Sequence, residues 1–336
     1  MRVSVVGFGR MGARLCDAAE RAGHEVAAVL DPAPEPYGAK VRQDLASRLH
    51  HDPSAFWRVP SDIVAIGTTA PSHAPLLEES LAHGFRRIIV EKPFACSVVE
   101  ARRAVASAQA AGARVLVNHS RRYCPNFLKI ARRPPQLAHL GRLRSFSSIV
   151  GGGSLGCVGV HFLDLCNMLF GAMPESVTCR LTEPGAPNVR GVGFDDPGGS
   201  AYITYPCAGR AFIDFSDDIG VYSGVVMAFE EAVLSMEDEF APWRMRVRRP
   251  EDRGKPFSQN GLPLEEEAFP LETFSMMDRW AAMFEDAARD GPTVSGAEFG
   301  VQSLELYAAL RWSAKTGRTL GFPLPREAEE AVYPIP

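Results

Sequence analysis

The sequence predicts an α/β protein in two parts. Residues 1–120 are expected to form an N-terminal doubly wound parallel sheet, and residues 121–336 a second α/β domain with an open, mainly antiparallel sheet. In the first part, short β-branched segments alternate with helical segments, which is typical of parallel sheets. In the second, strand-like segments follow one another across short turns, which favours antiparallel pairing. The 336 residues are enough for two domains of ordinary size.

The composition argues against several classes of protein. The formal net charge is −4 and acidic residues lie among the short arginine pairs, so we expect no nucleic-acid partner. No run of about 18 uncharged apolar residues occurs, so we expect no membrane span. The seven cysteines form no CxxC pair and no complete ligand set for a metal. This pattern favours reduced thiols in a cytoplasmic protein without a bound metal.

The first strand, helix and second strand carry a nucleotide-binding pattern. A β-branched run at residues 3–6 leads into G-x-G-x-x-G at Gly7, Gly9 and Gly12. A helical stretch then ends at Gly23, and the next strand, residues 24–31, ends in an aspartate. The glycines allow a tight turn, a close approach of a pyrophosphate and close helix packing, while the helix N-terminus offers free N–H groups. The turn is therefore predicted to bind a dinucleotide through Gly7, Phe8, Gly9, Arg10, Met11 and Gly12.

The aspartate at the end of the second strand predicts which dinucleotide the turn binds. Asp31 lies 19 residues after Gly12, the spacing at which an acid accepts hydrogen bonds from the adenosine ribose. Its charge would repel a 2′-phosphate. We therefore expect NAD rather than NADP as the cofactor.

The alternation of strand and helix continues to residue 120. Strands are expected at residues 61–69, 86–93 and 113–120, with helices at 70–84 and 97–112. Ligands of doubly wound sheets bind at the carboxyl ends of the strands. The polar residues at these ends are therefore candidates for the site: Thr68, Thr69, Glu91, Lys92, Asn118 and His119.

The second part contains strands first and helices last. Strand-like segments lie at residues 141–150, 198–209, 210–218 and 221–236, and the loop-like segment 183–198 could cover a site, reach a neighbouring subunit or be a plain surface loop. Helices are expected at 274–291 and 295–317. The second is expected to begin with an S-x-x-E capping box made by Ser295 and Glu298.

Four segments, in this order, carry a resemblance to a known family: GFGRMG at 7–12, VEKPFA at 90–95, NHSRRYCP at 118–125 and GGGSLGCVGVHFLDL at 151–165. The last helix with SAKTGRTLGFPL at 313–324 also fits. The chain resembles the glucose–fructose oxidoreductase / inositol dehydrogenase (Gfo/Idh/MocA) family over nearly its whole length. The resemblance implies a Rossmann domain, a carbohydrate-like substrate such as a sugar or polyol, and homodimers or homotetramers that associate through the sheet face.

The resemblance also assigns roles to individual positions. It implies that Lys92 is the catalytic lysine and His161 the acid/base histidine. It places Glu91 near the nicotinamide ribose, and Thr68, His73 and Asn118 at the cofactor cleft. Residues expected to line the substrate are Arg122, Tyr123, Cys157 and Asp164.

Chemistry supports the lysine and the histidine independently. Oxidation of a secondary alcohol needs a group that takes the hydroxyl proton, and a histidine with a pKa of about 6.5 can do so. A lysine at a strand end can hold the hydroxyl oxygen and stabilise developing negative charge. For each residue the alternative is structural: an ion-paired surface lysine, or a core histidine.

One position departs from the family pattern. The family usually has an acid four residues before the histidine, and this chain has Cys157 there. A neutral thiol is a poor hydrogen-bond acceptor and cannot replace a carboxylate. On a helix, Cys157, His161 and Asp164 would share a face.

Several explanations of this departure stay open. The substrate could lack the hydroxyl that the acid binds, or Lys92 and His161 could suffice without it. The protein could instead have lost turnover and remain a non-catalytic dinucleotide-binding protein, and a nucleophilic role for Cys157 is a further idea. Because some relatives cleave glycosidic bonds with NAD, that activity is an alternative to simple oxidoreduction.

Overall fold

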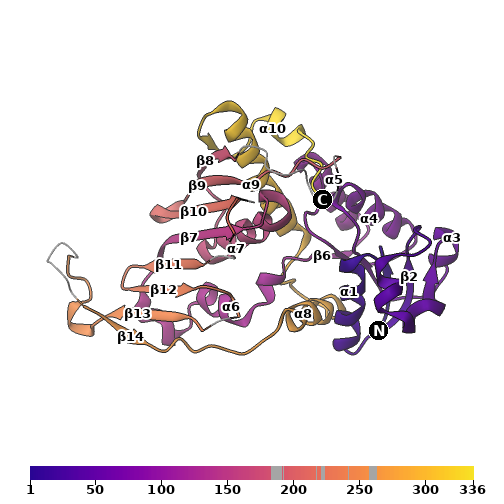
Figure 1. The fold of residues 1–336 in the computed structure, drawn as a ribbon, viewed down its shortest axis with the longest axis horizontal. Helices are drawn as coiled ribbons and strands as arrows, with labels where there is room; N and C mark the ends of the chain where they lie inside the picture. Colours follow the sequence, from indigo (N-terminus) through magenta and orange to yellow (C-terminus); the bar gives the residue numbers. More distant parts are fainter. Residues whose placement is uncertain (183–190, 192, 217, 221–223, 241, 257–262) are drawn as a thin grey trace.

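A computed structural model describes residues 1–336 except 183–190, 192, 217, 221–223, 241 and 257–262. Its strands form two sheets, one from each part of the chain (Figure 1). The α/β class and the two kinds of sheet predicted from the sequence are confirmed. No helix among the described residues is both long enough and apolar enough to cross a membrane.

The first sheet has six parallel strands in the order β3-β2-β1-β4-β5-β6. These strands are β1 (Arg2–Val6), β2 (Glu25–Leu30), β3 (Leu49–His50), β4 (Ile63–Ile66), β5 (Arg87–Val90) and β6 (Arg114–Val117). This is the strand order of a doubly wound dinucleotide-binding sheet, with its switch point between β1 and β4. The carboxyl ends of β1, β4, β5 and β6 therefore meet at one edge, which is where the predicted site residues lie.

Helices cover both faces of this sheet. The helices that follow its strands are α1 (Arg10–Arg21), α2 (Tyr37–Val41), α3 (Pro53–Phe56), α4 (His73–Ala82) and α5 (Val98–Ala110). Val3 and Val5 of β1 belong to a core cluster with α1, whereas Val6 belongs to the cluster with α4 and α5. Successive strand residues point to opposite faces, so the continuous apolar runs of these strands are needed to fill both layers.

Over the described residues, the second sheet has nine strands in the order β14-β13-β12-β11-β7-β10-β9-β8-β15. Among these strands, β7 and β10 are the one parallel pair. The bounds are β7 (Leu143–Gly151), β8 (Ser176–Leu181), β9 (Gly199–Tyr205), β10 (Gly209–Ser216), β11 (Val225–Phe229), β12 (Ala232–Met236), β13 (Arg244–Arg248), β14 (Leu264–Glu267) and β15 (Leu320–Gly321). Helices α6 (Pro125–Arg132), α7 (Val160–Phe170) and α9 (Ala297–Thr316) lie on one face (Figure 1). The short helix α10 (Arg326–Glu330) follows β15.

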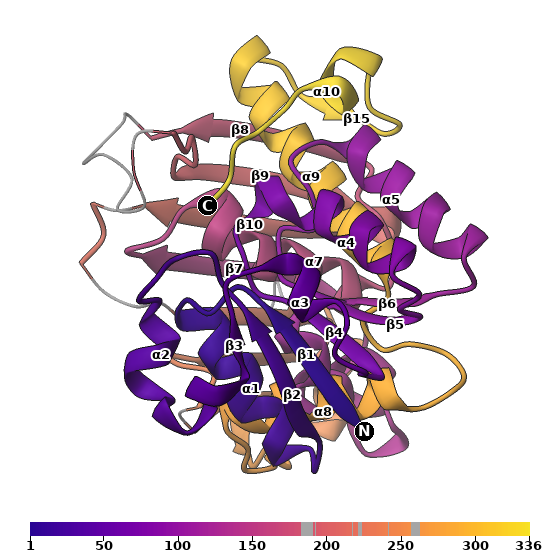
Figure 2. The same cartoon turned by 90° about the vertical axis from the view of Figure 1, so that its right-hand side faces the viewer.

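The second part of the chain reaches back onto the first sheet. Helix α8 (Met276–Ala288) packs beside α1, and its Met283 and Phe284 are buried in the cluster that contains Val3 and Val5 (Figures 1 and 2). Arg21 and Asp278 form an ion pair between the two helices. The two parts thus share one core layer, and a boundary at residue 120 stays a prediction.

Two details of the predicted helices are wrong. Ser295 does not cap α9, because the N-cap is Gly296 and the Ser295 hydroxyl instead donates to the carbonyl of Val117 at 2.7 Å. A capping box does occur at the start of α8, between Ser275 and Asp278. The expectation that Cys157, His161 and Asp164 lie on one α-helix is also wrong, because Leu155–Gly159 forms a single turn of π-helix, here called the π-turn, before α7 begins.

The loop-like segment 183–198 lies largely outside the described residues. Its described part includes Phe194–Gly198 and carries Asp195 and Asp196. The expectation that the whole segment is a loop stays a prediction.

Candidate active site

The glycine turn after β1 has the geometry that a dinucleotide needs. Gly7 has a φ of +87°, and a Cβ on Gly12 would lie 1.8 Å from the carbonyl oxygen of Gly7. These two glycines are required by the turn and by the close packing of α1. A Cβ on Gly9 would meet no atom within 4 Å, so the space in front of Gly9 is open. No side chain caps the N-terminus of α1 at Gly9, which leaves its N–H groups for an anion.

Asp31 lies beside this turn. Its carboxylate accepts hydrogen bonds from the backbone N–H groups of Phe8 at 2.7 Å and Ala33 at 2.9 Å. The Phe8 side chain is buried in the core, so only its backbone faces the turn. Arg10 is exposed and lies over the ring of Tyr37, 5.5 Å from its centre. Met11 is half-buried beside them.

His73 connects the ends of β4 and β5. Its Nδ1 lies 2.7 Å from the carbonyl oxygen of Pro93 and its Nε2 lies 3.1 Å from that of Thr68. Burial lowers the pKa of His73 to about 4, so the ring is neutral at pH 7 and donates from one nitrogen only. Thr68 and Thr69 are half-buried, and both accept hydrogen bonds from the hydroxyl of Ser72.

Glu91 and Asn118 form a buried pair at the ends of β5 and β6. The side-chain amide of Asn118 donates to Glu91 at 2.6 Å. The amide oxygen of Asn118 is buried and has no hydrogen-bond partner among the described residues. Together with the open space at Gly9 and the uncapped helix, this spare acceptor shows that the residues present fit a dinucleotide.

Lys92 meets the stretch 151–171 at the same edge of the sheet. Its Nζ donates to the carbonyl oxygen of Cys157 at 2.6 Å and lies 3.8 Å from the Cys157 sulfur. Lys92 precedes a cis peptide bond to Pro93 and is half-buried. Two motifs that are 65 residues apart in the sequence are thus in direct contact.

His161 lies in the first turn of α7 beside this contact. Its Nδ1 is buried without a partner among the described residues, and its ring meets that of His119 edge to face at 6.4 Å. Burial lowers the pKa of His161 well below its usual value, and the positive charges of Lys92 and Arg121 lower it further. His161 is therefore neutral at pH 7, the form that can accept a proton.

A buried cluster of charged residues next to His161 has no signal in the sequence. Arg121 and Arg279 both donate to Glu239, at 3.2 and 2.8 Å. Arg121 also lies over the ring of Phe162, 4.3 Å from its centre. Glu239 is 118 residues from Arg121 in the sequence, and only the fold brings them together.

Arg122, Tyr123 and Asp164, predicted to line the substrate, are buried and bind other protein groups. Arg122 Nε donates to both oxygens of Asp164, at 2.8 and 2.9 Å. The Tyr123 hydroxyl donates to Asp286 at 2.8 Å. Cys157, His161 and Asp164 therefore have different partners, since the π-turn disrupts the α-helical spacing that would align them. A substrate-lining role for these residues stays a prediction.

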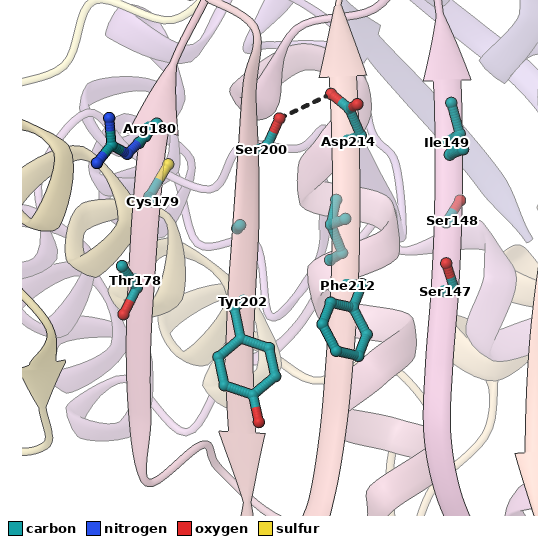
Figure 3. A pocket seen from close by; sticks show the side chains of 12 residues that line it. Ser147, Ser148, Ile149, Thr178, Cys179, Arg180, Ser200, Tyr202, Phe212 and Asp214 are labelled. Carbon is teal, nitrogen blue, oxygen red and sulfur yellow. Dashed lines mark hydrogen bonds between the residues drawn. The ribbon is translucent and has the colours of Figure 1, made fainter.

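Two other observations concern ligands. Among the described residues, no group of three or more His, Cys, Asp or Glu side chains could hold a metal ion. A hollow of about 460 Å³ lies on the open face of the second sheet (Figure 3). None of the predicted site residues lines it.

Comparisons with known proteins agree with this geometry. Residues 1–119 match GFO_IDH_MocA, described as the oxidoreductase family with an NAD-binding Rossmann fold. A D-apiose dehydrogenase from Paraburkholderia graminis is 29% identical over 165 residues. That alignment covers 44% of this chain and 44% of the relative, less than half the length of each.

Solved structures with a similar fold cover nearly the whole chain. One is an oxidoreductase from Agrobacterium radiobacter in complex with NAD+, L-tartaric acid and magnesium, with a TM-score of 0.76, 18% identity, and coverage of 96% of this chain and 98% of that one. Another is a UDP-N-acetylglucosamine 3-dehydrogenase from Acidithiobacillus ferrooxidans, with a TM-score of 0.76, 20% identity, and coverage of 94% and 98%. The first 119 residues are thus similar to the NAD-binding Rossmann domain of the Gfo/Idh/MocA oxidoreductases, and the chain shares its fold from end to end with these solved structures.

Proposed function

We propose that the protein is an NAD-dependent dehydrogenase or ketoreductase acting on a secondary alcohol or ketone of a sugar, cyclitol or sugar derivative. The observation that carries the proposal is the hydrogen bond from Lys92, at the carboxyl edge of a nucleotide-binding sheet, to the stretch that carries His161. Lys92 is also close enough that its charge lowers the pKa of His161. The named activities of two similar proteins, on D-apiose and on UDP-N-acetylglucosamine, support a carbohydrate-like substrate.

The cofactor would lie along the edge formed by β1, β4, β5 and β6. The glycine turn and the N-terminus of α1 would bind its pyrophosphate, and Asp31 its adenosine ribose. Thr68, Thr69, His73, Glu91 and Asn118 would border its nicotinamide half. Bound NAD supplies the group that accepts or returns hydride. The carboxylate of Asp31 beside the turn favours NAD over NADP.

Lys92 and His161 divide the remaining chemistry. The Lys92 ammonium can donate a hydrogen bond to the reacting oxygen and stabilise negative charge that develops there. The neutral His161 imidazole can take the hydroxyl proton, because burial and nearby cations keep it unprotonated. The cluster of Arg121, Glu239 and Arg279 contributes to this state through its positive charge. The protonation state of His161 suits oxidation of an alcohol.

We also propose that the protein is a cytoplasmic homodimer or homotetramer joined through the open face of the second sheet. Each of the seven cysteines is a free thiol, as expected in a reducing compartment. On the open sheet face, Ile149, Tyr202, Phe212 and Val226 expose between 41% and 51% of their surface. A row of exposed apolar side chains on adjacent strands is typical of a contact between subunits.

A substrate screen tests the proposed activity. The purified protein is incubated with NAD+ or NADP+ and a panel containing D-apiose, myo-inositol, uronic acids and nucleotide sugars, and formation of reduced cofactor is followed. We expect turnover of at least one compound with NAD+, and a loss of at least about tenfold in kcat/KM in Lys92→Ala and in His161→Ala. If neither variant changed turnover of a confirmed substrate, these residue roles would be wrong.

The same screen separates the alternatives. Product formation from a glycoside with bound NAD+ and no net NADH would indicate glycoside cleavage. NAD binding by calorimetry with no product from the whole panel would favour a non-catalytic dinucleotide-binding protein. Tighter binding of NADP+ than of NAD+ would contradict the role of Asp31.

A further inference from the structure

The carboxylate of Asp196 binds the turn that holds Lys92. Asp196 is 9% exposed and lies just before β9. Its Oδ1 accepts from the N–H of Gly156 at 2.6 Å, and its Oδ2 accepts from the N–H of Cys157 at 2.7 Å. The hydroxyl of Ser154 donates to Oδ2 as well. One buried carboxylate thus satisfies two free N–H groups at the beginning of the π-turn.

The same turn connects this carboxylate to the lysine. The N–H of Cys157 donates a hydrogen bond to Asp196, and its carbonyl oxygen accepts one from the Lys92 ammonium. Only the main-chain atoms of one residue separate the carboxylate from the ammonium. Any movement of Asp196 would therefore move the acceptor that holds Lys92.

Electrostatics gives a second reason for a carboxylate here. The N-terminal end of a helical segment carries partial positive charge, which is unfavourable for a nearby ammonium. The Lys92 ammonium contacts the first turn of such a segment, where it donates to the carbonyl oxygen of Cys157. The negative charge of Asp196 offsets this effect. Burial raises the pKa of Asp196, while its three hydrogen-bond donors and the charge of Lys92 oppose that rise.

The loop that carries Asp196 is bound by α9 and by the C-terminal segment. The N–H of Asp195 donates to the carbonyl of Pro334 at 3.0 Å, and its carboxylate pairs with Arg311 at 2.6 Å. Ile335 is fully buried, and a Cβ on Gly156 would lie 2.7 Å from both Ile335 and Asp196. The C-terminal segment therefore fixes Asp196 against the π-turn.

We propose that Asp196 is a positioning residue for Lys92, and that it supplies from a distant loop the negative charge that the chain lacks at position 157. This inference rests on the proposed function only for the consequence that a displaced Lys92 lowers turnover. The hydrogen-bond path from Asp196 through Cys157 to Lys92 stands without it.

The test measures the reactivity of the Lys92 amine, which needs no substrate. The full chain is treated briefly with acetic anhydride, and acetylation of Lys92 is quantified by peptide mass spectrometry, with the exposed Lys40 as internal reference. Only the unprotonated amine reacts, and a nearby negative charge keeps an amine protonated. In Asp196→Asn we expect Lys92 to react at least about threefold faster than in the wild type. Asp195→Asn is the matched control and should stay within about twofold, because its carboxylate faces Arg311.

A second variant distinguishes charge from simple disruption. Cys157→Asp restores an acid next to Lys92, so adding it to Asp196→Asn should bring the Lys92 rate back toward that of the wild type. If Asp196→Asn alone did not fold but the double variant with Cys157→Asp did, this rescue would also support the proposal. An unchanged Lys92 rate in Asp196→Asn, an equal change in Asp195→Asn, or no recovery in the double variant would overturn it.

Turnover, where the substrate screen finds any, gives an independent result. Asp196→Asn should lower kcat by about tenfold or more and leave the KM for NAD+ nearly unchanged, because Asp196 acts on Lys92 and not on the dinucleotide turn. A loss confined to the KM for NAD+ would contradict the proposed role. If the proposed activity itself is wrong, no compound turns over but the Lys92 reactivity still changes.

Discussion

The protonation of the buried histidines is set by burial and not by their hydrogen bonds. His73 and His119 are each 1% exposed, and burial lowers the pKa of each to about 4. At His119 the charge of Asp164 opposes this shift, while Arg122 and Lys92 add to it. The Nε2 of His119 meets the hydroxyl of Ser303 at 3.0 Å, and its Nδ1 is buried without a partner among the described residues. Both rings are therefore neutral at pH 7.

These lowered pKa values predict acid sensitivity. Between pH 6.5 and pH 4 the unfolded chain binds protons at these two histidines and the folded chain does not, so the free energy of unfolding falls as the pH falls. The loss would reach about 3 kcal/mol for each histidine at the low end of this range. The slope of the unfolding free energy against pH reports the difference in bound protons between the unfolded and the folded chain. His119→Gln should reduce this difference by about one proton, measured by urea titration at several pH values between 4 and 6.5.

The control for this prediction keeps the imidazole and changes its partner. Ser303→Ala removes the hydroxyl at Nε2 and should lower stability at all pH values without reducing the slope. An equal slope in the wild type and in His119→Gln would show that His119 titrates normally in the folded chain.

Single residues also show where sequence reasoning reached its limit. Lys92 and His161 are candidates from the sequence because each lies in a motif with local spacing, and their catalytic roles stay predictions. Asp196 and Glu239 could not be predicted, because their partners lie 39 and 118 residues away in the sequence. The pairing of Arg122 with Asp164 was equally hidden, since only the packing of α7 brings a buried carboxylate to that guanidinium.

At the scale of elements, the sequence predicts the strands and helices whose apolar residues recur with a strong strand or helix period. Each predicted strand of the first sheet is present. A short apolar run bounded by a glycine and by a polar residue is typical of a buried strand and of few other structures. The sequence does not predict β8, β13 and β14, nor the two-residue strands β3 and β15. β14 (LEEE) is the edge strand of the second sheet and β13 (RMRVR) lies next to it. Both are rich in charged residues, so neither shows the apolar pattern of a buried strand.

The glycine turn allows a test in which folding and cofactor binding separate. Gly12→Ala would place a Cβ 1.8 Å from the Gly7 carbonyl and should lower stability by about 1–3 kcal/mol or more. Gly9→Ala meets no protein atom and should lower stability by less than about 1 kcal/mol. It should nevertheless weaken NAD binding at least about tenfold, because the added methyl group occupies the approach of the pyrophosphate.

Calorimetry with NAD+ and thermal unfolding, run on both variants, check this pair of expectations. Wild-type affinity for NAD+ in Gly9→Ala would show that the dinucleotide does not approach this turn. A fully stable Gly12→Ala variant would show that α1 can move away from β1.

At the scale of the whole molecule, the first sheet is the proposed cofactor-binding sheet, and within the described part of the chain the second sheet has helices on only one face. Helices α7 and α9 cover one face of the second sheet, and α7 carries His161 (Figure 1). On the other face, side chains from β7, β8, β9 and β10 surround a shallow hollow (Figure 3). A subunit contact on the open face would cover the side of the sheet that faces away from α7 and α9.

The open face should therefore decide the oligomeric state. The rings of Tyr202 and Phe212 lie 4.9 Å apart on neighbouring strands and point outward (Figure 3). Replacing both by glutamate would bury charge in the proposed contact, so we expect Tyr202→Glu with Phe212→Glu to convert a dimer or tetramer into a monomer. The melting temperature of the isolated subunit should change little, because both side chains face away from its core. Light scattering coupled to gel filtration measures the mass, and Val99→Glu, an exposed apolar position on α5, is the matched control. A wild-type monomer, or an unchanged mass in the double variant, would place any subunit contact elsewhere on the molecule.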